Sequence, residues 1–175
     1  MSLNNNFNIR RLERYLSVTY DSGAAPVVVL TKSDLCSNVE SKITEAQNAA
    51  PGVDVLAISS LDEDYEAVMK YILPGKTVAF IGSSGVGKST LINKLTGTNR
   101  IATREIGNDD TGRHTTTHSE LITLQNGAFV IDTPGMRELG MWDSGDGINT
   151  AFADIEELSR MCRYADCTHT SEPGC

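Results

Sequence analysis

The segment at residues 82–89 has the residue types and the spacing to bind a phosphate group. It reads GSSGVGKS and fits the pattern G-x-x-x-x-G-K-[ST]. Glycines let successive backbone N–H groups turn toward a phosphate, the Lys88 ammonium can reach the β- and γ-phosphates, and the Ser89 hydroxyl can bind Mg²⁺. The alternative is an ordinary glycine-rich turn, but an expected strand before the segment and an expected helix after it favour a phosphate loop. The residues predicted to bind a nucleotide here are Gly82, Ser83, Ser84, Gly85, Val86, Gly87, Lys88, Ser89 and Thr90.

A second motif, TKSD at residues 31–34, resembles the NKxD element with which GTPases bind the base. It follows a short apolar run typical of a buried strand, and ligands of open α/β sheets bind beyond the carboxyl ends of the strands. The Asp34 carboxylate could accept hydrogen bonds from N1–H and the N2 amino group of guanine, which adenine lacks. The resemblance places Lys32 over the base, with Ser33 beside it and Thr31 where Asn is usual. The alternative is a strand end followed by a helix N-cap.

Two further motifs also follow expected strands and resemble GTPase elements. AISS resembles the short loop whose backbone N–H meets the guanine O6, so Ser60 is expected to supply that N–H, with Ser59 beside it. DTPG resembles the DxxG element, in which Asp132 would hold Mg²⁺ through water and the Gly135 N–H would face the γ-phosphate.

A long polar stretch between these motifs contains HTTT, which resembles the first switch of a GTPase. Thr116 is the preferred magnesium ligand there, ahead of Thr115. Met136 occupies the position after DxxG where many GTPases carry a water-orienting Gln, so we expect slow intrinsic hydrolysis and a partner that completes the site. His114 is the candidate to supply the missing polar group, unless it only orders the loop.

The order of the motifs differs from that of ordinary GTPases. The two base-binding motifs precede the phosphate loop here, which predicts a circularly permuted GTPase. Over about residues 10–175, the ordered motifs resemble the ribosome small subunit-dependent GTPase A (RsgA) family. The resemblance implies GTP/GDP and Mg²⁺ as ligands, a role in late maturation of the small ribosomal subunit, contact with its rRNA, and stimulation by that subunit. It also suggests a fragment without the family's N-terminal OB-fold.

Three cysteines and a histidine near the end of the chain could bind a metal. Cys162, Cys167, His169 and Cys175 form C-x4-C-x-H-x5-C, a donor set suited to a closed tetrahedral Zn²⁺ site. Scattered thiols beside a solvated histidine are the alternative, and the resemblance to the family's zinc knuckle favours zinc. Because the DTPG motif leads toward this segment, we hypothesise that rearrangement of the second switch moves the metal module.

The elements that position these motifs alternate between strands and helices. Apolar runs predict strands at 27–30, 54–58, 77–81, 118–124 and 128–132, and the remaining periodicity predicts helices at 8–20, 38–49, 62–72, 88–95 and 150–161. This order predicts an α/β fold, namely a P-loop NTPase three-layer sandwich with a mostly parallel sheet. The expected domains are 1–145 for the GTPase and 146–175 for the start of a helical zinc-binding module.

Composition limits the classes of protein that remain. The chain has 175 residues, 39% hydrophobic, and a net charge of −8, which disfavours nucleic-acid binding by bulk electrostatics. No apolar run approaches the length of a membrane span, and the polar start is unlike a signal peptide. We expect a soluble, cytoplasmic monomer. The competing interpretations are a P-loop ATPase or kinase, and a scaffold that binds guanine nucleotides without hydrolysis.

Overall fold

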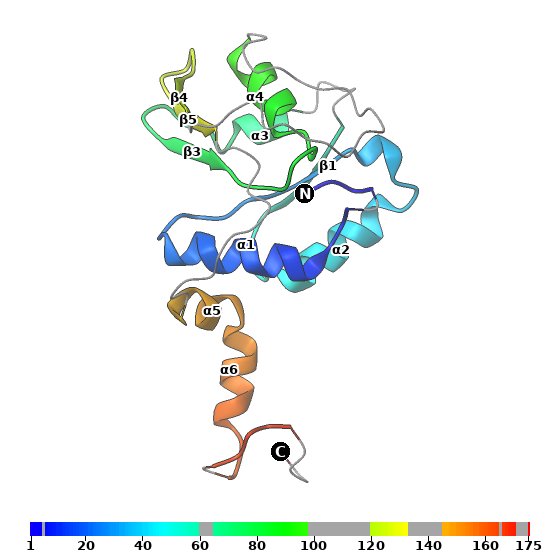
Figure 1. The fold of residues 1–175 in the computed structure, drawn as a ribbon, viewed down its shortest axis with the longest axis vertical. Helices are drawn as coiled ribbons and strands as arrows, with labels where there is room; N and C mark the ends of the chain where they lie inside the picture. Colours follow the sequence, from blue (N-terminus) through cyan, green and yellow to red (C-terminus); the bar gives the residue numbers. More distant parts are fainter. Residues whose placement is uncertain (5, 60–64, 98–119, 133–144, 165, 171–174) are drawn as a thin grey trace.

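Two small hydrogen-bonded sheets form the middle layer of the fold (Figure 1). The computed structural model describes residues 1–175 except 5, 60–64, 98–119, 133–144, 165 and 171–174. In the first sheet, β1 (Val28–Thr31) pairs in parallel with β2 (Val55–Ile58). In the second, β5 (Phe129–Asp132) lies between β3 (Thr77–Phe80), which is parallel to it, and β4 (Glu120–Thr123), which is antiparallel.

The expected strands are therefore present, but their arrangement differs from one mostly parallel sheet. The hairpin between β4 and β5 turns at Gly127, whose φ of 81° is a left-handed conformation that glycine adopts without steric cost. The hairpin introduces the antiparallel pair, and the described hydrogen bonds divide the strands into two groups. The α/β class is confirmed, with small and mixed sheets.

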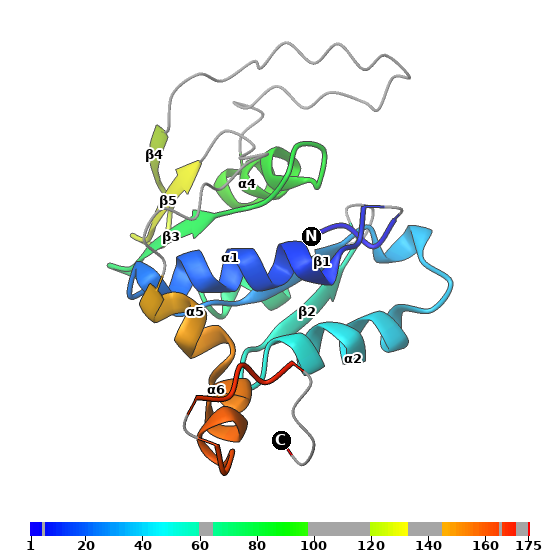
Figure 2. The same ribbon diagram turned by 60° about the horizontal axis from the view of Figure 1, so that its bottom comes forward.

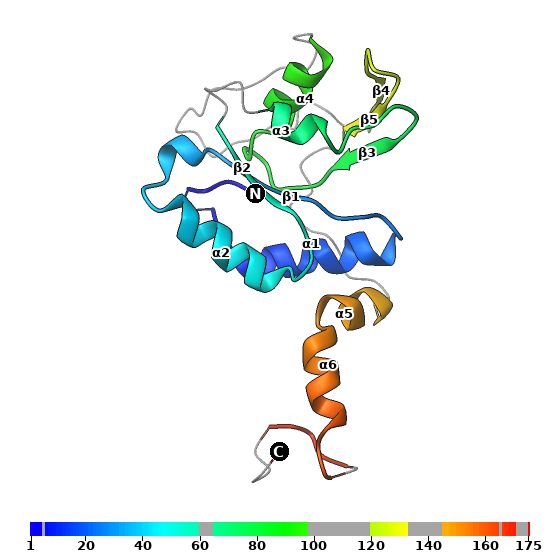
Figure 3. The same ribbon diagram turned by 180° about the vertical axis from the view of Figure 1, so that it is seen from behind.

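Helices cover both faces of the sheets and bury two apolar clusters (Figures 1 and 2). Successive residues of β1 alternate between the clusters, as the period of a strand requires. Val28 and Leu30 face α1 (Ile9–Asp21) and α2 (Val39–Ala49), whereas Val29 packs against the other cluster. That second cluster contains residues of α3 (Glu66–Met69) and α4 (Lys88–Thr96), which Figure 3 shows from behind. The expected three layers are confirmed.

The N-terminal ends of α1 and α2 are stabilised in the same way. The Asn8 side chain accepts a hydrogen bond from the Arg11 backbone N–H, and the Asn38 side chain accepts one from Ser41 N–H. Each cap satisfies a helix donor that has no partner within the helix. Leu12 and Leu16, four residues apart, bury the inner face of α1. Local sequence therefore determines where both helices begin.

The C-terminal helix prediction was wrong in its boundaries. Instead of one helix at 150–161, the chain forms α5 (Gly145–Ala151) and α6 (Ala153–Arg160), which are separated at Phe152 by a backbone with φ −122° and ψ 34°. Gly145 and Gly147, which precede the predicted helix, lie inside α5. Gly147 is buried, and a Cβ there would overlap the Ser17 carbonyl oxygen of α1. Position 147 therefore requires glycine because α5 packs closely on α1, although glycine has a low helix propensity.

The Gly147 contact predicts a measurable loss of stability. In Gly147→Ala the new methyl group would meet the Ser17 backbone and the Asp21 carboxylate, which accepts the Gly147 N–H. Because a backbone oxygen cannot swing away, α5 must move, and overpacking of this kind costs about 1–3 kcal/mol. Urea unfolding should show that loss, with faster hydrogen exchange in α5. Asn149→Ala, at an exposed position of the same helix, should change neither measurement. Equal stability of Gly147→Ala and the unchanged chain would contradict the packing.

Among the described residues, no helix combines the length and the apolar character that crossing a membrane requires.

Candidate functional site

The predicted motifs meet where the parallel strands end. Thr31 and Ile58 are paired at the carboxyl ends of β1 and β2, and Phe80 and Asp132 are paired at the carboxyl ends of β3 and β5. The base-binding and phosphate-binding segments leave the sheets from these ends, which are the usual ligand-binding edge of an α/β fold.

The phosphate loop has the backbone conformation that its glycines allow. Gly85 has φ 75° and Gly87 has φ 98°, both left-handed, and α4 begins directly after Gly87. The Lys88 ammonium donates hydrogen bonds to the carbonyl oxygens of Gly82, at 2.6 Å, and Ser83, at 3.0 Å. Ser89 and Thr90 lie in the first turn of α4, where backbone N–H groups have no partner within the helix. The strand, loop and helix expected around the motif are all present.

Positive charge gathers beside this loop. The α-amino group of Met1 is buried and donates to the Val29 carbonyl oxygen. Burial, together with repulsion from Lys88 and Arg11, lowers the pKa of this amine to about 5. The Met1 amine, which lies near both cations, is therefore neutral at pH 7. The same field would favour an anion such as a phosphate.

The base-binding loop presents Asp34 to solvent. Lys32 is one of two described non-glycine residues with positive φ (φ 60°, ψ 41°), and it turns the chain into a short 3-10 helix at Ser33–Leu35. The exposed Asp34 carboxylate accepts a hydrogen bond at 2.8 Å from the hydroxyl of Ser59, which is buried. Ser59 orients one carboxylate oxygen, and the other points to no described donor. The motif identified Ser59 as a neighbour of the base but did not indicate this bond.

Thr31 connects the two loops although it replaces the usual Asn. Its hydroxyl donates to the carbonyl oxygen of Val86 in the phosphate loop, at 2.6 Å, and lies 3.3 Å from the Met1 carbonyl oxygen. Val86 is buried, so its carbonyl would lose a partner without the hydroxyl. The hydroxyl therefore links the base-binding loop to the phosphate loop.

Removing this hydroxyl should weaken both loops. Thr31→Val keeps the shape of the side chain but leaves the Val86 carbonyl without its 2.6 Å donor, at a cost of about 1–3 kcal/mol. We expect roughly fivefold to hundredfold weaker binding of a fluorescent guanine nucleotide, measured by titration. Thr31→Ser retains the hydroxyl and should bind within about twofold of the unchanged chain. If Thr31→Val and Thr31→Ser bound the nucleotide with equal affinity, the hydrogen bond from Thr31 to Val86 would not support the two loops.

Several predicted residues lie outside the described residues. They are Ser60, His114, Thr115, Thr116, Gly135 and Met136. For Asp132 the structure places the backbone at the last position of β5. The roles expected of these residues stay predictions.

One residue that contacts the phosphate loop was missed by the motif analysis. Asn6 donates to the Ser83 hydroxyl, although the two residues are 77 positions apart. Nothing in the N-terminal segment matches a nucleotide-binding pattern, so only its position in the fold reveals the contact.

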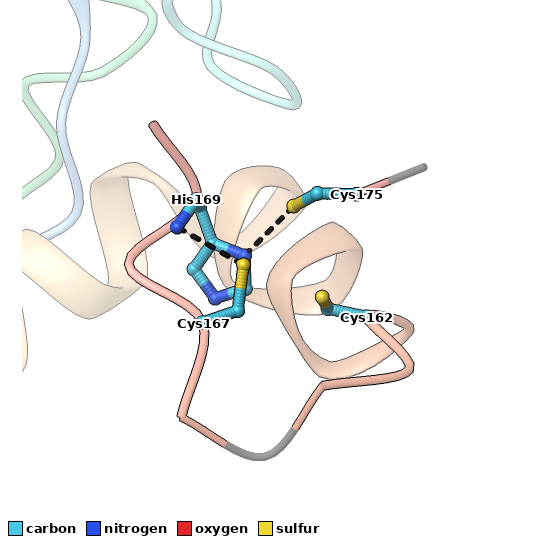
Figure 4. A group of neighbouring side chains, drawn as sticks. All are labelled: Cys162, Cys167, His169 and Cys175. Atoms are coloured by element: carbon cyan, nitrogen blue, oxygen red, sulfur yellow. Dashed lines mark hydrogen bonds between the residues drawn. The ribbon is translucent and has the colours of Figure 1, made fainter. Parts of the chain in front are cut away.

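The predicted metal ligands converge after α6 (Figure 4). The three sulfur atoms of Cys162, Cys167 and Cys175 and the His169 ring nitrogen all lie within 4.8 Å of one another. The His169 Nδ1 is 3.2 Å from the Cys175 sulfur, and the His169 backbone N–H donates to the Cys167 sulfur at 3.3 Å. Ligands about 2.3 Å from a tetrahedral Zn²⁺ would stand roughly 3.8 Å apart. The cluster therefore fits zinc in both donor type and spacing.

The thiols influence each other's protonation. A hydrogen bond from the Tyr164 backbone lowers the pKa of Cys162, and bonds to Cys167 and Cys175 lower it further. Hydrogen bonds with Cys167 and Cys162 raise the pKa of Cys175 to about 11. One thiolate is thus favoured at the expense of its neighbour. A cation among them would stabilise all three thiolates together.

Comparisons with known proteins agree with these features. Residues 1–142 match the family model described as RsgA GTPase. The small ribosomal subunit biogenesis GTPase RsgA 2 of Lactiplantibacillus plantarum is 53% identical over 177 residues, covering 100% of this chain and 50% of that protein. The chain spans about half the length of the curated relatives it matches.

Solved structures support the arrangement of the elements. The crystal structure of YloQ, described as a circularly permuted GTPase, is 29% identical with a TM-score of 0.68, covering 100% of this chain and 56% of that one. YjeQ from Thermotoga maritima is 24% identical with a TM-score of 0.69, covering 99% of this chain and 59% of that one, a likeness of fold alone. Because β1 and β2 precede the phosphate loop here too, the predicted permuted order is confirmed.

Proposed function

This chain belongs to the RsgA GTPase family, and from that premise we propose that it binds GTP and GDP with Mg²⁺ and hydrolyses GTP to GDP and phosphate. One observation carries the proposal: the base-binding loop is hydrogen-bonded to the phosphate loop through Thr31 and Val86. A nucleotide must contact both loops at once, and this bond holds them at the same edge of the fold.

Selection of guanine is assigned to Asp34. Its carboxylate only accepts hydrogen bonds, and guanine offers two donors, N1–H and the N2 amino group. Ser59 holds the carboxylate through one oxygen, which reduces the conformational freedom that binding must remove. Adenine carries an acceptor at N1 and no amino group at C2, so it would leave the carboxylate without a partner. This argues against an ATPase or a small-molecule kinase.

Hydrolysis is assigned to the phosphate loop, to the segment between α4 and β4, and to the DTPG motif that begins at the end of β5. Attack of water on the γ-phosphorus breaks its bond to the bridging oxygen, and the Lys88 ammonium and loop N–H groups stabilise the charge that develops. Mg²⁺, when bound, would neutralise the β- and γ-phosphate oxygens, and the hard oxygen donors of Ser89, Thr116 and Asp132 suit it by type. We assign the Gly135 N–H to the γ-phosphate and His114 to the water.

The small ribosomal subunit is the proposed partner. The relatives at 53% and 49% identity are named small ribosomal subunit biogenesis GTPases. We propose that this chain forms the nucleotide switch of such a protein and works in the cytoplasm as a monomer. It acts in contact with rRNA. The small subunit accelerates its slow intrinsic hydrolysis of GTP. Met136, which cannot orient water by hydrogen bonding, supports the slow rate.

We propose a division into a GTPase domain at 1–145 and the start of a zinc-binding module at 146–175. α6 buries none of its side chains, and its Ile155 and Leu158 are exposed, as is Met161 directly after it. The metal cluster follows α6 at the end of the fold opposite α4 (Figures 1 and 2). Since α5 packs on α1, movement of the second switch that reaches the module would change this contact. Hydrogen exchange that is identical across residues 146–175 with GDP and a GTP analogue would exclude that movement.

Phosphate release measures the proposed function directly. With GTP we expect slow release that purified small subunits accelerate, and with ATP we expect release at background level. Lys88→Ala should abolish release in every condition, since the phosphates lose their cation. If His114 acts on the water, His114→Ala should lose the stimulation while binding GTP normally. Binding without any release, even with subunits, would identify a guanine-nucleotide scaffold instead.

A further inference from the structure

The N-terminal segment before α1 contacts the phosphate loop. The side-chain amide of Asn6 donates to the Ser83 hydroxyl at 3.1 Å, across 77 positions of sequence. Nearby, Leu3 N–H donates to the Thr31 carbonyl and Thr31 N–H donates to the Met1 carbonyl, which fixes the segment beside β1. The segment thus lies against both nucleotide-binding loops, and Asn6 contacts the first of the three serines in the phosphate loop.

Arg11 determines which end of the Asn6 amide faces the loop. The Arg11 guanidinium donates to the Asn6 side-chain oxygen at 2.6 Å and to the Asn6 carbonyl oxygen at 3.4 Å. A guanidinium has donors and no acceptor, so the amide oxygen must face Arg11. The amide nitrogen is then directed to Ser83. The Asn6 backbone N–H also donates to the Asn4 side chain, which fixes the turn.

Ser83 is consequently held from two sides. Its carbonyl oxygen accepts from the Lys88 ammonium at 3.0 Å, and its hydroxyl oxygen accepts from Asn6. A bound phosphate would compete for the charged Lys88 ammonium, whereas neither Asn6 nor Ser83 carries a charge.

We propose that Asn6 and Arg11 are positioning residues that preorganise the phosphate loop for the nucleotide. The inference rests on the proposed function, because it concerns the same site. Arg11 orients the Asn6 amide, Asn6 holds Ser83, and the loop keeps its binding conformation before the phosphates arrive. Preorganisation of this kind lowers the cost of ordering the loop on binding.

A double-mutant cycle tests the contact. Loss of a neutral hydrogen bond corresponds to about threefold to tenfold weaker binding, so Asn6→Ala should raise the dissociation constant of fluorescently labelled GDP by that factor. Ser83→Ala removes the acceptor from the other side. If Asn6 acts through Ser83, adding Asn6→Ala to Ser83→Ala should weaken binding by less than about twofold further. Independent, multiplying effects would overturn the proposal.

Arg11 has a matched control on the same helix. Arg11→Ala frees the Asn6 amide to rotate and should weaken binding as Asn6→Ala does. Arg10→Ala removes an equal charge from an exposed position that pairs with Glu13, and it should leave the affinity unchanged. In both active variants KM for GTP should rise while kcat changes little, and the preference for guanine over adenine should persist. If Arg10→Ala and Arg11→Ala weakened binding equally, the loss of positive charge, and not the orientation of Asn6, would account for the effect.

Two further outcomes separate this inference from the function on which it rests. If the unchanged chain does not bind labelled GDP, the proposed function fails. If the unchanged chain binds labelled GDP, and both Asn6→Ala and Ser83→Ala bind it as tightly as the unchanged chain does, only the positioning role fails. Should Asn6→Ala not fold, Ser83→Ala and Arg11→Ala report on the same contact from its two ends.

Discussion

Replacing Asp34 with Asn should weaken GDP binding by about a hundredfold or more. The carboxylate is the only group of this side chain that can accept from both guanine donors, and each bond to a charged acceptor contributes about 1.5–3 kcal/mol. The Asn amide would also direct an N–H₂ group at the guanine amino group. Xanthine carries a carbonyl oxygen at that position, so Asp34→Asn should bind xanthosine diphosphate better than GDP. Competition titrations against fluorescent GDP measure both changes.

The controls for this variant address the fold and the loss of charge. Glu40→Gln removes an exposed acid from the first turn of α2, outside the base loop, and should leave GDP affinity unchanged. Ser59→Ala keeps the Asp34 carboxylate but loses the bond that orients it, and it should produce a smaller loss without the preference for xanthine. An Asp34→Asn chain that binds GDP as tightly as before would mean that another group selects the base.

Replacing Cys167 with Ser should release the metal that the C-terminal cluster is expected to bind. A serine hydroxyl is a poor substitute for a thiolate toward Zn²⁺, and the remaining two sulfurs and one imidazole leave a position open. Structural zinc contributes about 10–16 kcal/mol to small metal-binding folds, far more than the few side-chain contacts around this segment. Purified chain should contain about one zinc per molecule and the variant much less. Elemental analysis and hydrogen exchange over residues 162–175 measure the two effects.

Nucleotide binding should survive this change. The cluster lies at the end of the molecule opposite α4, so Cys167→Ser should bind GDP with unchanged affinity (Figures 1 and 3). Cys36→Ser, which replaces a half-buried thiol beside the base loop, should retain the zinc. Zinc loss in both cysteine variants would show that the metal is bound through no specific set of ligands.

The local parts of this molecule were predictable because they depend on residue type and spacing. The phosphate loop, the TKSD motif and the metal ligands carry their chemistry in contiguous or closely spaced residues, and the structure brings each set together. The strand and helix periods were readable for the same reason. Two predictions of arrangement were less accurate, namely the single sheet and the helix at 150–161. Both depend on how elements pack, which a local pattern does not encode.

The sequence by itself determined the class of fold and the permuted order of motifs, and it predicted the residues of the site. Only the tertiary structure decided how the motifs support one another. Thr31 contacts Val86, Ser59 holds Asp34, and Asn6 holds Ser83 across 55, 25 and 77 positions of sequence. Hydrogen bonds require donor and acceptor to approach to about 3 Å. That approach depends on how the strands pair and how the helices and loops pack around them. Spacing along the chain does not specify this packing.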